Sequence, residues 1–81
     1  MTELEKYRSM IDKIDNDIIK LLNERYSICI KVGEYKKKNN IPVLNSSREA
    51  DIIDRLSANE QYRGMVSSLW PYIMAFSRSL Q

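Results

Sequence analysis

The feature that most constrains this chain is an unbroken seam of residues that runs through most of its N-terminal half. The seam residues alternate spacings of three and four along the sequence: Leu4, Tyr7, Ile11, Ile14, Ile18, Leu21, Arg25, Ile28, Val32 and Tyr35. This spacing is typical of a helix that packs lengthwise against other helices. It predicts one helix over residues 3–38, which at a rise of ~1.5 Å per residue would be roughly 50 Å long. Because a globule of 81 residues is narrower than that, we expect much of the helix to lie against a second chain.

The chain has 81 residues, which is enough for one domain over residues 1–81 but only for a small core. Its single cysteine, Cys29, cannot form an internal disulfide, and without histidine we expect no metal site. Association with a second copy is then the remaining way to stabilise so short a chain. The balance of 13 Lys and Arg against 11 Asp and Glu argues against a dedicated nucleic-acid binder.

The sequence also lacks membrane and export signals. No apolar run approaches the length that crosses a membrane, and the first ten residues, MTELEKYRSM, have no apolar core of a signal peptide. We therefore expect a cytoplasmic protein without a membrane partner. The chain can be a complete protein or one domain of a longer one.

Two shorter helices are expected after the long one, and no segment has a strand pattern, so the predicted class is all-α. Residues 39–42, Asn-Asn-Ile-Pro, end the first helix, because asparagine can cap a helix end and proline cannot continue it. The second helix is predicted to open with a capping box of Ser46 and Glu49. After a short turn at residues 57–61, a third helix continues to the C-terminus. Pro71 either kinks this helix or stands in its first turn.

Polar residues that interrupt the apolar pattern of the first helix are candidate site residues. Arg25 is the one charged residue of the seam, and a buried guanidinium needs an anionic partner, either a glutamate of the protein or a ligand. Lys36 lies on nearly the same side of the helix about 16 Å further along, so both cations can reach one ligand, although a lysine run is also typical of a solvated helix end. Arg8 lies about 25 Å from Arg25. Alone it is an ordinary surface arginine, and only a partner chain can bring a copy of it to the same site.

The later helices contribute four more candidates. Arg48 and Glu49 stand in the predicted first turn of the second helix, where a purely local role in capping and solvation is the alternative. Ser77 and Gln81 are four residues apart, so they share one face of the third helix beside apolar residues. That face predicts a polar pocket or, alternatively, an ordinary exposed helix end.

Together these residues resemble the all-helical (AroQ-class) chorismate mutases along essentially the whole chain. The resemblance is carried by Arg8-x-x-Ile11-x-x-Ile14-Asp15, Leu22-x-Glu24-Arg25, Val32-Gly33-x-x-Lys36, Ile41-Pro42-Val43, Arg48-Glu49 and Ser77-x-x-x-Gln81. It implies an intertwined homodimer of three-helix chains, each with a very long first helix. The reaction it implies is the Claisen rearrangement of chorismate to prephenate in aromatic amino acid biosynthesis, without cofactor or metal.

The resemblance also implies a role for each candidate. Three arginines bind the two substrate carboxylates through their planar guanidinium forks: Arg25, Arg48 and, from the neighbouring subunit, Arg8. Ser77 assists them, and Glu49 accepts a hydrogen bond from the substrate hydroxyl. Lys36 and Gln81 donate to the ether oxygen, which becomes more negative in the transition state. Asn45, also expected to bind substrate, stands where the family often has aspartate, and asparagine can replace the hydrogen bonding of that residue but not its charge.

Two other functions fit the same pattern. The isochorismate-pyruvate lyases share the fold and much of the cationic site, although Glu49 and Ser77 favour the mutase. A non-enzymatic helical dimerisation module needs only the apolar seam. For such a module, Arg25→Leu would stabilise the protein and small dicarboxylates would not bind.

Overall fold

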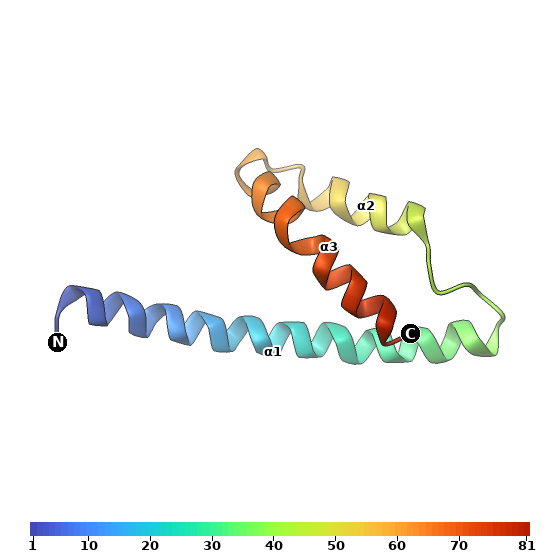
Figure 1. Ribbon diagram of the computed structural model, residues 1–81, viewed down its shortest axis with the longest axis horizontal. Coiled ribbons are helices and arrows are strands. Elements are labelled where there is room, and N and C mark those ends of the chain that lie inside the picture. The colour runs from blue at the N-terminus through green and yellow to red at the C-terminus, as the bar shows by residue number, and fades with distance from the viewer.

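The computed structural model describes all 81 residues, Met1 to Gln81, as a helical chain without a strand. Its elements follow in the order α1 (Glu3–Lys38), α2 (Ser46–Leu56), the short 3-10 helix η1 (Glu60–Tyr62) and α3 (Arg63–Ser79). The predicted all-α class and the predicted bounds of the long first helix are confirmed. α1 runs along the 56 Å longest dimension of the molecule, and α2 and α3 lie together on one side of its C-terminal half (Figure 1).

Local hydrogen bonds explain where α1 begins and ends. At its start the Thr2 hydroxyl accepts from the Glu5 N–H at 3.1 Å and so satisfies one of the free amides of the first turn. At its end Asn40 adopts a left-handed conformation with φ 55°, and the Ile41 N–H donates back to the Lys36 carbonyl at 2.8 Å. This is the long hydrogen bond of a Schellman-type cap, so the predicted stop at the two asparagines is confirmed.

The start of α2 differs from the prediction. Asn45 is the N-cap, and its Oδ1 accepts from the Arg48 N–H at 3.0 Å and from the Ser47 hydroxyl at 2.9 Å. The predicted capping box of Ser46 and Glu49 is therefore wrong. Asparagine caps a helix as well as serine does, and the Glu49 carboxylate pairs with a guanidinium of α3 instead of its own backbone.

The approach to α3 is also more regular than predicted. The expected turn at residues 57–61 begins at Ser57, the C-cap of α2, and leads directly into η1. Because α3 begins at Arg63, Pro71 lies inside this helix and not in its first turn. Proline has no N–H, so the Ser67 carbonyl loses its usual partner within the helix.

The chain by itself has very little core. Only five residues are buried: Gly33, Ile52, Val66, Met74 and Ser77. All nine apolar residues of the seam are at least 38% exposed, and no other element lies beside the N-terminal half of α1 (Figure 1). A stripe of apolar side chains this long is not usual on the surface of a monomer. None of the helices combines the length and apolar character that a membrane crossing requires.

Candidate active site

An open pocket of about 340 Å³ lies between the C-terminal half of α1, the start of α2 and the end of α3. Seven of the eight predicted site residues line it: Arg25, Lys36, Asn45, Arg48, Glu49, Ser77 and Gln81. Cys29, Arg78 and several apolar side chains complete the wall. The eighth predicted residue, Arg8, lies seventeen residues before Arg25 on α1 and does not line the pocket. The fold thus brings together residues from all three α-helices and leaves Arg8 outside.

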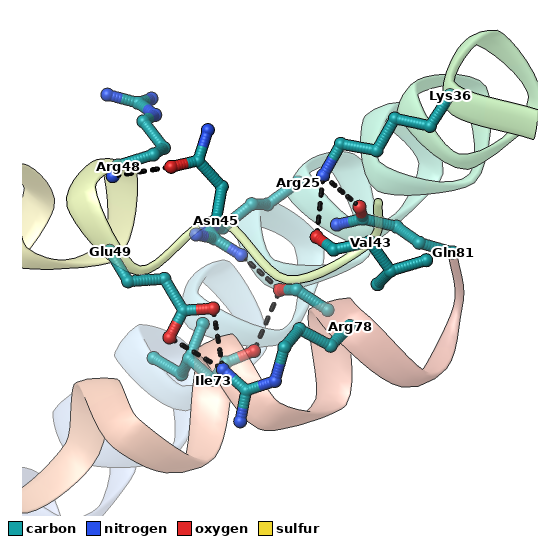
Figure 2. Close-up of polar contacts among 10 residues, drawn as sticks. Arg25, Lys36, Val43, Asn45, Arg48, Glu49, Ile73, Arg78 and Gln81 are labelled. Atoms are coloured by element: carbon teal, nitrogen blue, oxygen red, sulfur yellow. Dashed lines mark hydrogen bonds and ion pairs between the residues drawn. The ribbon is translucent and has the colours of Figure 1, made fainter. Parts of the chain in front are cut away.

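Arg25 contacts α3 through a neutral partner. Its Nη1 donates to the Ser77 hydroxyl and approaches the Cys29 sulfur at 3.9 Å. The Ser77 hydroxyl in turn donates to the Ile73 carbonyl at 2.7 Å, and the residue is only 5% exposed (Figure 2). Because no carboxylate pairs with Arg25, the internal ion pair considered from sequence is absent, and its charge remains available to an anionic ligand.

Lys36 joins three parts of the pocket wall. Its Nζ donates to the Val43 carbonyl and to the Gln81 Oε1, each at 2.8 Å (Figure 2). The first bond holds the loop between α1 and α2, and the second holds the side chain of Gln81. Since the Gln81 amide oxygen is engaged by Lys36, its NH₂ group is left to donate to a ligand.

Gly33 is the reason that Gln81 can reach Lys36. A Cβ added at Gly33 would lie 2.6 Å from the Gln81 Cα and 3.0 Å from its carbonyl oxygen, so a larger residue would push the C-terminal backbone away. Gln81 itself lies two residues beyond the end of α3 and not on the helix face predicted for it. Its N–H still donates to the Arg78 carbonyl at 3.0 Å, which continues the turn of the chain.

The Glu49 carboxylate is held by Arg78, a residue that the sequence analysis missed. The Arg78 Nη1 donates to both carboxylate oxygens at 2.6 Å, and the two side chains are 34% and 24% exposed, respectively (Figure 2). Arg78 follows Met74 by four residues and precedes Gln81 by three, so helical spacing from these two neighbours places it on the pocket side of α3. That spacing was the available signal, but an arginine near a helix end is usually solvated.

Arg48 and Asn45 form the mouth of the pocket. The Arg48 side chain is exposed, extends away from the Arg25–Ser77 contact and has no hydrogen-bond partner in the protein (Figure 2). Asn45 uses its side-chain oxygen to cap α2, an interaction that aspartate would also make.

The pocket wall is predominantly cationic, with four positive side chains against the single carboxylate of Glu49. Of the four, only Arg78 is paired with an acid, so the remaining cations favour a small ligand with more than one negative charge. No cluster of three or more His, Cys, Asp or Glu side chains is placed to bind a metal ion. Fold and site together define a small all-helical protein with a cationic pocket between its helices, suited to an anionic ligand.

Comparison with known proteins gives the family. The sequence profile described as chorismate mutase type II matches residues 7–81 of the chain. The chain belongs to this family, and the resemblance expected from the sequence is confirmed.

Three relatives illustrate the similarity. The bifunctional chorismate mutase/prephenate dehydratase of Aquifex aeolicus is 40% identical over 67 residues, which are 82% of this chain and 18% of that protein. The chorismate mutase of Methanocaldococcus jannaschii is 43% identical over 54 residues, or 67% of this chain and 54% of that protein. A conserved hypothetical protein from Pyrococcus furiosus has a solved structure with a TM-score of 0.81 and 32% identity, covering 99% of this chain and 96% of its own. The match thus spans about half the length of one curated relative and less than a fifth of the other.

Proposed function

We propose that the chain is a chorismate mutase that rearranges chorismate to prephenate in the pocket described above. The observation that carries the proposal is the grouping of Arg25, Lys36 and Arg48, none of them paired with an acid, around one open pocket. The reaction has one substrate and needs no nucleophile. An enzyme accelerates it by holding the substrate in a compact conformer and stabilising the charge that develops as the ether bond breaks.

Each pocket residue has a role in this proposal that suits its contacts. Arg25, oriented by Ser77, and the exposed Arg48 bind the two carboxylates, because guanidinium groups match carboxylates in shape and charge. The Lys36 ammonium has three N–H donors, and two of them form hydrogen bonds within the protein. The third can donate to the ether oxygen, beside the Gln81 amide. Glu49 accepts from the substrate hydroxyl.

The proposal includes a homodimer in which the Arg8 of a second subunit completes each site. Support comes from the exposed seam of α1 and from an apolar groove of about 550 Å³ between α1 and α3, lined by Ile18, Leu21, Leu22, Met65, Leu69, Trp70, Tyr72 and Ile73. Arg25 lines both this groove and the cationic pocket. A partner helix seated in the groove would therefore pass close enough to add a cation to the site.

The experiment that tests the proposal is an assay of chorismate and isochorismate side by side, with identification of the products. A mutase consumes chorismate and forms prephenate, whereas a lyase releases pyruvate from isochorismate. A dimerisation module would turn over neither, and Arg25→Leu would stabilise it. The cytoplasmic location expected from the sequence stays a prediction.

A further inference from the structure

We infer that Arg78 is a positioning residue for Glu49, whose negative charge it offsets so that a dianionic substrate can bind beside that carboxylate. Like the proposed function on which it rests, this role requires a substrate with two carboxylates. Glu49 is the single acidic side chain in the pocket wall. Left uncompensated, its charge would repel the same anions that Arg25, Lys36 and Arg48 attract.

Among the cations of the pocket, only Arg78 is placed to offset the charge of Glu49, because the other three have different contacts. Arg25 donates to Ser77, Lys36 donates to Val43 and Gln81, and the Arg48 side chain points away from the Arg25–Ser77 contact (Figure 2). Arg78 is the one cation in contact with the Glu49 carboxylate, through Nη1 at 2.6 Å from each oxygen.

The pair also leaves Glu49 able to act. A carboxylate offers about four acceptor positions, and one nitrogen lying between its two oxygens occupies only part of them. A substrate hydroxyl can therefore still donate to Glu49 while Arg78 holds it. The two side chains come from different helices, so the pair fixes the carboxylate at the border between α2 and α3.

A purely structural role for the pair is a weaker explanation. Ile52 on α2 and Val66 and Met74 on α3 are the buried apolar residues of the chain, and α2 packs against α3 independently of the ion pair. An ion pair whose side chains remain 34% and 24% exposed adds little to stability, because water screens it. Its main effect is on the charge that a ligand meets in the pocket.

The test compares steady-state kinetics with chorismate for a set of variants. Removing the charge in Arg78→Met should raise KM about tenfold or more with little change in kcat, because the repulsion acts on substrate binding. Arg78→Lys keeps the charge and should recover most of the loss. Arg63→Met, at the exposed start of the same helix, is the matched control and should keep the wild-type KM. Should Arg78→Met not fold, Arg78→Gln takes its place.

A double-variant cycle with Glu49→Gln distinguishes three roles of Arg78. These are compensation of the Glu49 charge, a structural link between α2 and α3, and direct binding of the substrate. If Arg78 offsets the charge of Glu49, the KM ratio of Arg78→Met to wild type falls as ionic strength rises, and adding Arg78→Met to Glu49→Gln has no further effect on KM. If the pair only ties α2 to α3, that KM ratio does not fall with added salt. If Arg78 binds substrate directly, the rise persists in the Glu49→Gln background. Either of these results, or an unchanged KM in Arg78→Met, would overturn the inference. A wild-type protein without mutase activity would instead overturn the proposed function first.

Discussion

At the scale of single residues, Gly33 decides how closely the C-terminus approaches α1. Gly33→Ala should cost at least tenfold in activity, because the new methyl group displaces the Gln81 backbone, and mispositioned groups lose their effect in the transition state. Helix content should be kept or increased, since alanine is favoured over glycine in helices by about 1 kcal/mol. Gly64→Ala is the matched control, because a Cβ there meets nothing within 4 Å. Equal activities of the two variants by the chorismate assay would contradict the expectation.

Gln81 offers a second test at this scale, through the pH dependence of the maximal rate. A neutral amide donates hydrogen bonds at any ordinary pH, whereas a carboxyl group donates only when protonated. Gln81→Glu should therefore be active mainly in acid, and its activity should fall as pH rises through the pKa of the new carboxyl group. Deletion of Gln81 should lower the rate at every pH while helicity by circular dichroism is kept. A glutamate variant with the wild-type profile at an undiminished rate would remove Gln81 from the proposed site.

From residue types and spacing alone, eight site residues were predicted, and seven of them line one pocket. Three details of the site could not be predicted in this way. Arg78 was not predicted as a site residue because its partner, Glu49, is 29 positions away in the sequence, and no helical spacing relates residues so far apart. The approach of Gln81 to Gly33 is likewise a tertiary contact without a local signal. The choice of Asn45 over Ser46 as N-cap was missed because both residue types cap well and stand next to each other.

At the scale of elements, the cap between α1 and α2 rests on the left-handed conformation of Asn40. Asn40→Val should lower the free energy of unfolding by about 1–2 kcal/mol, because a β-branched side chain clashes with the backbone in that conformation. Asn40→Gly should be neutral or slightly stabilising, since glycine adopts it freely. Denaturant unfolding followed by circular dichroism measures both changes. Equal stabilities of the two variants would mean that the cap carries no strain.

Long periodic elements were the most predictable ones. The regular seam and the two asparagines were enough to predict α1 to its observed ends. The short η1 was predicted only as a turn, because three residues are too few to show a period. Pro71 left two alternatives open, since proline is favoured in a first turn but is also tolerated inside a helix that packs on other elements.

At the scale of the whole molecule, the scarcity of buried residues predicts that the chain does not persist as a folded monomer. Analytical ultracentrifugation at micromolar concentration should give the mass of a dimer. A compact, stable monomer under these conditions would contradict the proposed homodimer and the shared site with it.

The sharing of a site between subunits has its own test, because Arg8 and Lys36 would then serve one site from different chains. Arg8→Ala and Lys36→Ala should each be nearly inactive. Unfolding and refolding them together should restore roughly a quarter of wild-type activity, since half of the dimers are mixed and half of their sites carry neither substitution. Absence of recovery, after subunit exchange has been verified by mass spectrometry, would exclude Arg8 from the site.

The small core also bears on how much protein a cell must make. In the proposed homodimer, a chain that buries only five of its residues alone would fold mainly by association with another copy, so at low abundance the number of complete sites would rise with the square of the number of chains. Halving synthesis would then remove more than half of the activity, and chains that have not yet met would be open to proteolysis. Gene dosage would thus act on flux more steeply than it does for an enzyme that folds as a monomer.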